Sequence, residues 1–228
     1  MDLDPHEFWQ RIDPPGHSAE APPDGFAHSF PARLPDGRQL RLPIRVLPGA
    51  GTRAVASLIL NQASFAVEDA LADILAEKLR PLAPEVIVAV PTLGLPLANA
   101  VARRLGHTRL VALGTSRKFW YDEALSEPMS SITSPLAGKR IYLDPRMLPI
   151  CEKRRVAVID DVISTGSSMV AVLRLLERAG IAPVAVAAAM LQGESWRAPL
   201  APFADRIIGA FSSPLLERTA EGRWVPKS

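Results

Sequence analysis

Two neighbouring carboxylates and a run of small residues occur together in the segment RVAVIDDVISTGSSM, residues 155–169. Asp160 and Asp161 follow four apolar residues, and the run Ser-Thr-Gly-Ser-Ser follows two more. A small-residue turn that opens a helix presents N–H groups and hydroxyls at the positive end of the helix dipole, which suits a phosphate group. Carboxylates suit sugar hydroxyls or a hydrated Mg²⁺. The pattern therefore predicts a site for a phosphorylated sugar.

Each part of this pattern has an ordinary explanation when it is taken alone. Paired aspartates also end strands in unrelated metal-binding phosphotransfer proteins, and small-residue turns are common helix N-caps. The complete string is more restrictive than either part. It is not a Walker loop, because no Gly-Lys-Ser follows, and the chain contains no GxGxxG dinucleotide motif.

Apolar periodicity after residue 51 predicts helices that alternate with strands. Such alternation is typical of an α/β fold with a central, mostly parallel sheet and helices on both faces. In such sheets ligands bind at the carboxyl ends of the strands, where we expect Asp160 and Asp161. The predicted helices are 71–79, 97–105 and 169–176, ended by Pro81, Gly106 and Gly180; the predicted strands are 86–90, 109–113, 156–159, 184–189 and 206–210, with a short one at 140–144 and a loop at 91–96.

The N-terminal part differs in composition from the rest of the chain. Residues 1–50 are rich in proline and glycine, and 37–46 suggest a short hairpin or an edge extension of a sheet. Residues 51–228 carry the α/β pattern, and no linker divides the chain, so we expect a single domain overall. The segment 114–139 is longer than most loops of compact domains, which indicates a functional role or disorder.

Composition excludes several classes of function. Among 228 residues, 26 lysines and arginines balance 24 acidic residues, so bulk charge does not favour a nucleic-acid partner. The longest apolar runs, near 183–191, are about half the ~20 residues of a membrane span, and the acidic N-terminus is not a signal peptide. The single cysteine, Cys151, permits no intramolecular disulfide and has no catalytic signature. We therefore expect a cytoplasmic protein with no membrane partner.

The string VAVIDDVISTGSSM resembles the phosphoribosyl diphosphate signature of the type I phosphoribosyltransferases, and the resemblance extends over about residues 50–215. It implies a parallel sheet flanked by helices, with a hood supplied by the two chain ends. Asp160 and Asp161 would hold the ribose hydroxyls and, through water, Mg²⁺, and Asp161 would be catalytic. The residues implied for the ribose and the 5′-phosphate are Asp160, Asp161, Ser164, Thr165, Gly166, Ser167 and Ser168.

Two further segments resemble the diphosphate-binding parts of the same family. In VIVAVPTLGLPLANAVARRLG, residues 86–106, Thr92, Leu93 and Gly94 would offer backbone N–H groups to the leaving diphosphate. Many relatives carry Arg or Lys where this chain has Leu93. Arg117 and Lys118 resemble the basic start of the catalytic flexible loop and would supply that cation. The alternatives are a plain strand-to-helix turn for the first segment and solvated surface charges for the second.

The resemblance implies Mg²⁺-dependent transfer of a phosphoribosyl group from phosphoribosyl diphosphate to a nitrogenous base. Enzymes for oxopurines tend to carry an aspartate at the position of Ser164, which argues against that branch of the family. The stretch 130–161 resembles the adenine and xanthine type, so a purine is expected, with adenine favoured and Val162 beside the base. The expected partners are these two small molecules and a second copy of the chain in a homodimer. A non-catalytic regulator of the same fold and an orotate-type enzyme remain as alternatives.

Overall fold

The computed structural model describes residues 3–19, 22–49, 51–129 and 140–227. Its centre is a five-stranded sheet, here called the core sheet, in which every strand pair is parallel. The strand order is β11-β10-β9-β5-β6. The core strands are β5 (Val86–Ala89), β6 (Val111–Ala112), β9 (Val156–Ile163), β10 (Ala185–Gln192) and β11 (Ile207–Ser213). The α/β fold with a parallel sheet that the sequence predicts is confirmed.

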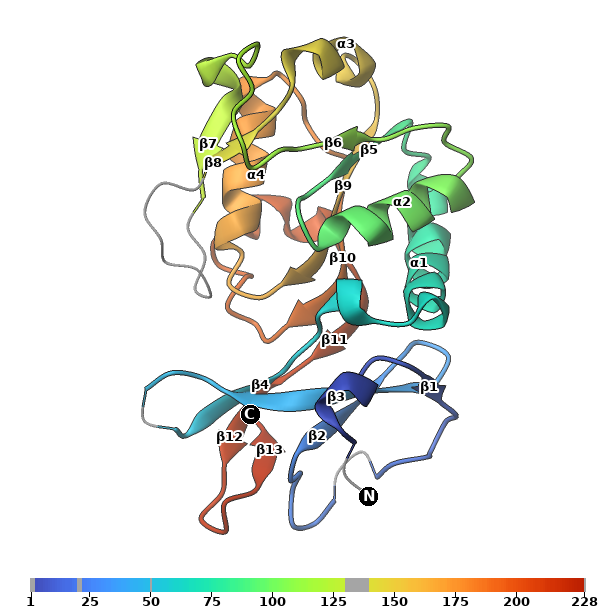
Figure 1. The fold of residues 1–228 in the computed structure, drawn as a ribbon, viewed down its shortest axis with the longest axis vertical. Helices are drawn as coiled ribbons and strands as arrows, with labels where there is room; N and C mark the ends of the chain where they lie inside the picture. The colour runs from blue at the N-terminus through green and yellow to red at the C-terminus, as the bar shows by residue number, and fades with distance from the viewer. Residues whose placement is uncertain (1–2, 20–21, 50, 130–139, 228) are drawn as a thin grey trace.

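Helices cover both faces of the core sheet, as predicted (Figure 1). The helices α1 (Phe65–Leu79) and α2 (Gly94–Arg104) share one apolar cluster with alternate residues of the strands, including Ile87 and Ile159. On the other face, α4 (Ser167–Arg178) packs with Val88 and Val158. Alternate strand residues point to opposite faces, so one apolar strand serves two cores. The shorter helices are α3 (Leu148–Cys151), η1 (Pro5–Glu7), η2 (Leu60–Gln62), η3 (Arg80–Leu82), η4 (Glu123–Leu125), η5 (Pro145–Met147) and η6 (Ala201–Arg206).

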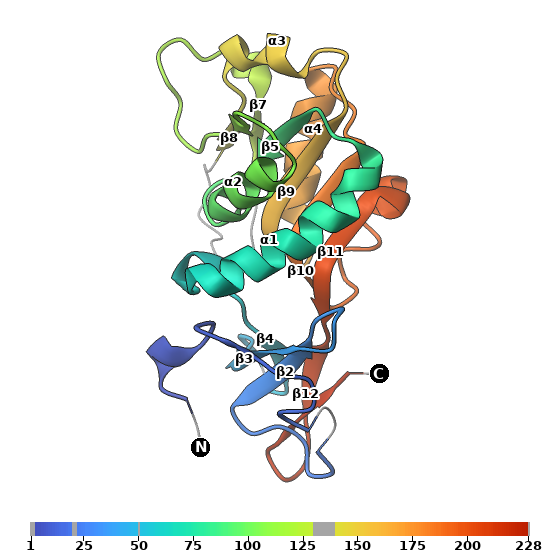
Figure 2. The same ribbon diagram turned by 90° about the vertical axis from the view of Figure 1, so that its right-hand side faces the viewer.

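The two chain ends together form a second, antiparallel sheet, here called the terminal sheet. Its order is β1-β3-β4-β12-β13, with β2 paired to β3, and Figure 2 shows it as a separate layer beyond the helices, close to both termini. Residues 37–46, where the sequence suggests a hairpin or an edge extension, are the end of the turn and the second strand of a hairpin whose first strand is β2. The strands are β1 (Ile12–Asp13), β2 (Ser29–Arg33), β3 (Gln39–Val46), β4 (Arg53–Ala56), β12 (Leu215–Arg218) and β13 (Trp224–Pro226).

Several boundaries differ from the sequence prediction: the helix predicted at 71–79 begins at Phe65, and the strand predicted at 109–113 is only Val111–Ala112. Three further differences concern the loop at 91–96, the strand at 140–144 and the paired aspartates. The predicted loop at 91–96 is shorter, because α2 already begins at Gly94. The predicted strand at 140–144 is β8 (Arg140–Tyr142), which pairs with β7 (Ser126–Pro128) in a separate two-stranded sheet. Most of the long predicted loop is thereby ordered around η4 and β7, and its residues 130–139 lie outside the described part of the chain.

The third difference concerns the paired aspartates, which lie within a strand rather than after it. β9 continues to Ile163 because its pairing with β10 continues that far, to Leu191. On the other side, β5 pairs with β9 only as far as Ile159. Asp160 and Asp161 therefore have a neighbouring strand on one side only, and the other side is open to the loop that follows β5.

Candidate functional site

The connections of the core sheet create a crevice between β5 and β9. From β5 the chain passes through α2 to β6, toward one edge of the sheet. From β9 it passes through α4 to β10 and then β11, toward the other edge. Because α2 and α4 lie on opposite faces, the loops that follow β5 and β9 diverge. Ligands of open α/β sheets bind at such a switch point, outside the carboxyl ends of the strands.

Asp160 and Asp161 stand at this switch point, at the open end of β9. Asp160 is 8% exposed, and its Oδ1 accepts the backbone N–H of Asp161 at 2.8 Å. Burial raises the pKa of Asp160 well above its ordinary value, and the charge of Asp161 adds to this effect. Burial also raises the pKa of Asp161. A buried carboxylate beside a partly exposed one favours a ligand that offers hydroxyl donors or positive charge.

The predicted diphosphate loop lies directly against this pair. A Cβ placed on Gly94 would come within 2.8 Å of the Asp160 Cα and 3.0 Å of its Oδ1. Only glycine fits this approach without a shift of backbone, so the start of α2 and the carboxylate pair form one site. Thr92 is exposed and Leu93 is partly exposed, and the Pro91–Thr92 peptide bond is cis. The structure thus brings Gly94 against Asp160, and Thr92 and Leu93 directly precede Gly94 in the chain.

The predicted phosphate turn lies at the start of α4. Gly166 is the N-cap of α4 and has a φ of 81°, in the left-handed region that favours glycine. The Thr165 and Ser167 hydroxyls are 3.1 Å apart. Ser167 and Ser168 already belong to the first turn of α4, where N–H groups have no intrahelical partner. This turn has the chemistry of an anion site.

Val162, the residue expected beside the base, is partly exposed, whereas three large aromatic residues near the C-terminal end of the chain are buried. Val162 is partly exposed near the end of β9, two residues from Asp160, and borders the apolar cluster under α1 and α2. Trp196, Phe211 and Trp224 are each buried, and Trp196 donates its indole N–H to the Gly193 carbonyl at 2.9 Å. In this conformation these three aromatic residues are packing residues.

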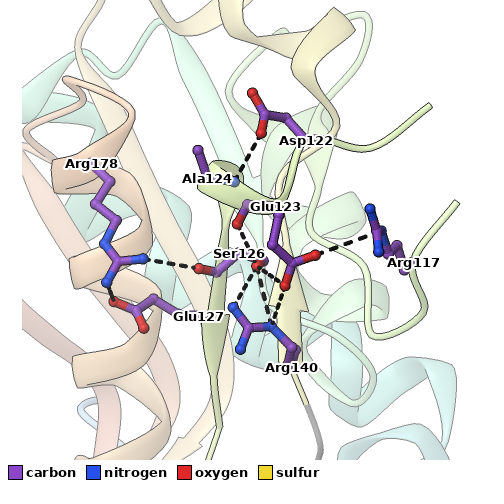
Figure 3. Close-up of polar contacts among 8 residues, drawn as sticks. All are labelled: Arg117, Asp122, Glu123, Ala124, Ser126, Glu127, Arg140 and Arg178. Atoms are coloured by element: carbon purple, nitrogen blue, oxygen red, sulfur yellow. Dashed lines mark hydrogen bonds and ion pairs between the residues drawn. The ribbon is translucent and has the colours of Figure 1, made fainter. Parts of the chain in front are cut away.

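Arg117 and Lys118 are not brought to the carboxylate pair, in contrast to the catalytic role expected for them. Figure 3 shows the Arg117 guanidinium against Glu123, at 3.6 Å, among the polar groups around β7 and β8. Arg140 also contacts Glu123, at 3.3 Å. Lys118 is exposed. Within the described residues, neither cation has a recorded contact with Asp160 or Asp161.

The aromatic residues after Lys118 attach this segment to η5. The Trp120 indole donates to Asp144 Oδ2 at 3.3 Å, and the Arg146 guanidinium lies 4.4 Å from the centre of the Trp120 ring. Hydrogen bonds from Arg146 lower the pKa of Asp144 to about 2, although burial opposes this shift. Phe119 is 97% exposed. The segment therefore has both an anchored part and a free aromatic tip.

The donor set at the switch point limits the kind of metal ion that fits there. Among the described residues no group of three or more His, Cys, Asp and Glu could hold a metal ion. Asp160 and Asp161 provide two carboxylates. Mg²⁺ commonly binds through one or two carboxylates, with water and substrate phosphates as its other ligands. The residues therefore fit a hydrated Mg²⁺ that is shared with a phosphorylated substrate.

Sequence reasoning missed contacts that join distant parts of the chain. The Gln192 amide donates to the Ala56 carbonyl at 2.9 Å, in a buried link between β10 and β4. A Cβ on Gly166 would lie 3.2 Å from Leu200. The sequence indicated that β5 and β9 are parallel strands of one sheet, but it did not give their register. No local pattern therefore predicted that Gly94 lies against Asp160. Each of these contacts depends on tertiary packing.

Comparison with known proteins shows the family of this chain. The model of the phosphoribosyl transferase domain matches residues 58–211, which is more than half of the chain and includes the loop after β5 and the β9–α4 turn. The chain therefore belongs to the phosphoribosyl transferase domain family. A hypoxanthine/guanine phosphoribosyltransferase of Methanosalsum zhilinae is 36% identical over 95 residues; the match spans 42% of this chain and 45% of that relative's length.

Solved structures show the same fold. An adenine phosphoribosyltransferase from Giardia lamblia, complexed with 9-deazaadenine, has a TM-score of 0.59 and 22% identity, covering 74% of this chain and 93% of that one. One from Rhodothermus marinus has a TM-score of 0.54 and 21% identity, with the same coverage. One from Thermoanaerobacter pseudethanolicus has a TM-score of 0.54 and 20% identity, covering 64% and 81%. At these identities the likeness concerns the fold.

Proposed function

We propose that this chain is a phosphoribosyltransferase that transfers the 5-phosphoribosyl group from phosphoribosyl diphosphate to a purine base and releases diphosphate. The observation that carries the proposal is that a carboxylate pair, of which Asp160 is buried, and two helix starts lie at one switch point. A ligand that has hydroxyls between two phosphorylated ends matches this arrangement. Membership of the phosphoribosyl transferase domain family supports the same proposal.

The roles of the residues follow from their positions. The turn 164–168 would receive the 5′-phosphate, and Asp160 and Asp161 would accept hydrogen bonds from the ribose hydroxyls. Residues 92–94 would receive the diphosphate through backbone N–H groups. A bound Mg²⁺ would neutralise part of the diphosphate charge, with Asp160 and Asp161 holding its water shell. Val162 would border the base.

The predicted diphosphate loop, residues 92–94, contains no side chain that supplies positive charge to the leaving diphosphate. Leu93 supplies none, so we propose that Arg117 and Lys118 supply it after a movement of their segment toward the switch point. The Arg117–Glu123 contact opposes this movement only weakly, because both side chains are more than half exposed. A movement of this kind would also exclude water from the reacting carbon.

Adenine is the purine that we propose first. Ser164 is the residue at the position where oxopurine enzymes tend to carry an aspartate, and three structural neighbours are described as adenine enzymes. Hypoxanthine or guanine is the second candidate, because the relative from Methanosalsum zhilinae carries that description. We also propose a cytoplasmic homodimer. Within the described residues, no helix is long and apolar enough to cross a membrane.

A panel of bases tests the proposal. The chain is incubated with phosphoribosyl diphosphate, Mg²⁺ and adenine, hypoxanthine, guanine, xanthine or orotate, and diphosphate release is measured. We expect release with adenine and at least tenfold less with orotate. Binding of phosphoribosyl diphosphate without release for any base would instead support the regulatory alternative. Faster release with hypoxanthine or guanine would reverse the order of the two purine candidates.

A further inference from the structure

Two adjacent hollows lie at the end of the core sheet opposite to the candidate active site. They have volumes of about 360 and 390 Å³ and share the segment His107–Leu110, which joins α2 to β6. The first hollow also borders the start of β5 and the chain between α3 and β9. In Figure 1 these connections lie in the upper part of the view, and the β9–α4 turn lies lower down. Both volumes are within the range of small-molecule sites.

The rim of the hollows carries an excess of positive charge. Arg109 borders both hollows, Arg103 borders the second and Arg154 the first. Among the described residues, Arg103 and Arg109 have no ion-pair partner, and Arg154 meets Glu85 only at 3.9 Å. Exposed guanidinium groups without carboxylate partners are available for a phosphate, which they bind through two parallel hydrogen bonds.

Apolar residues form one part of the first hollow, whose exposed lining is otherwise polar. Val86 is buried, and Leu110, Ile150 and Pro149 complete this surface. The Nε2 atom of His107 is buried beside it and has no hydrogen-bond partner in the described structure. Apolar residues beside a cationic rim suit a ligand that combines an aromatic ring with phosphate groups, because the ring can pack on the apolar residues while the phosphates reach the rim.

We propose that this place is a second binding site, for a nucleotide, separate from the candidate active site. Its ring would lie on Leu110 and Ile150, and its phosphates would contact Arg109 with Arg103 or Arg154. The site shares β5 and α2 with the active site, since Val86 begins the strand whose far end leads to Gly94. A bound nucleotide therefore contacts the same rigid elements that carry the diphosphate loop. This proposal does not depend on the proposed function.

Photolabelling of the full chain tests the proposal. The probe is 8-azido-ATP without added metal, with unlabelled ATP as competitor, and mass spectrometry of chymotryptic peptides locates the label. We expect competable label on peptides that contain residues 99–110 or 148–154. Label confined to peptides that contain 88–94 or 160–168 would overturn the proposal, because ATP would then enter only the candidate active site. Absence of competable label would overturn it as well.

Charge-reversal variants make the test specific. In the double variant Arg103→Glu/Arg109→Glu, we expect label at this place to fall about tenfold or more, because charge-assisted contacts to phosphate are lost. Arg174→Glu is the matched control, since Arg174 is exposed on α4, and it should keep the label. Arg109→Ala serves as a milder second variant. Unchanged label in the double variant would contradict the site. Diphosphate release, measured separately, tests the active site alone.

Discussion

At the scale of single residues, the carboxylate pair combines a functional role with a cost to the free protein. Asp160 is almost fully buried beside a second carboxylate, and burial raises its pKa well above the ordinary value. A folded-state pKa above the unfolded one means that the group stabilises the fold below the unfolded pKa, near 3.8. This stability is lost as the pH rises through the folded pKa. At neutral pH the buried Asp160 carboxylate therefore lowers the stability of the free protein, while it provides a binding group for the ligand.

Asp160→Asn is expected to make the free protein more stable at pH 7. Asparagine avoids the ionised, buried carboxylate, so we expect a gain on the order of 1 kcal/mol, or ~2–4 °C in melting temperature for a chain of this size. The gain should disappear as the pH falls toward 4, where the wild-type carboxyl group is neutral. Thermal unfolding across this pH range is the measurement.

Asp144→Asn is the control, and its melting temperature should change in the opposite direction. Arg146 lowers the pKa of Asp144 to about 2, so its charged form stabilises the fold at neutral pH. This variant should lower the melting temperature at pH 7. A lower melting temperature for Asp160→Asn as well would contradict the account of the carboxylate pair, because it would mean that the buried charge is well stabilised in the free protein.

At the scale of elements, the site depends on two helix starts whose glycines have different tasks. Gly94 allows α2 to approach the backbone of Asp160, and Gly166 gives the turn before α4 its left-handed conformation. The sequence predicted both helices and both loops, because glycine, proline and apolar periodicity are local signals. It did not predict that α2 starts three residues early, since helix starts are also set by what the first turn packs against.

Gly166→Ala is expected to weaken both the fold and phosphate binding. A left-handed alanine costs about 1–2 kcal/mol, and its Cβ would also press on Leu200. Gly180→Ala is the matched control, with a φ of 71° and nothing within 4 Å. Urea unfolding should show a loss in both variants. Calorimetric titration with phosphoribosyl diphosphate should show at least tenfold weaker binding for Gly166→Ala only. Equal binding by both variants would argue against the phosphate turn.

The basic segment after β6 gives a second prediction at this scale. The double variant Arg117→Ala/Lys118→Ala should lower kcat by about 100-fold, because it removes charge stabilisation of the leaving diphosphate. Its melting temperature should stay nearly unchanged, since the Arg117–Glu123 pair is exposed. Arg174→Ala is the control for loss of a surface cation. Steady-state kinetics provide the measurement, and an unchanged kcat would assign these cations to the solvated surface instead.

At the scale of the whole molecule, the two chain ends pair to form the terminal sheet, which is separate from the core sheet. The sequence suggested a hairpin or edge extension at 37–46, and the family resemblance implied a hood from the two chain ends, but neither gave the strand pairing. The pairing of β4 with β12 joins residues more than 150 positions apart, and no local pattern encodes such a contact. The α/β core was predictable because each of its elements repeats a local pattern. The terminal sheet was not, because it depends on which strand edges meet.

The buried link between the two sheets can be tested directly. Gln192→Leu removes the hydrogen bond to the Ala56 carbonyl and should cost about 1–3 kcal/mol of unfolding free energy, because a buried acceptor loses its donor. Gln10→Leu is the control: its exposed amide donates to the Gln62 carbonyl at 2.8 Å and to the Phe8 carbonyl, in a part-buried position, at 2.9 Å. Urea unfolding compares the two. A smaller loss for Gln192→Leu than for Gln10→Leu would contradict the structural role of this link.

The central claim is that the switch point between β5 and β9 transfers a phosphoribosyl group. The most direct measurement follows nucleotide and diphosphate together in a mixture of the chain, phosphoribosyl diphosphate, Mg²⁺ and adenine. We predict that both products form in equal amounts and that Asp161→Asn lowers their rate by at least 100-fold. If the wild-type chain left phosphoribosyl diphosphate intact with adenine and with every other base tested, the claim would be contradicted.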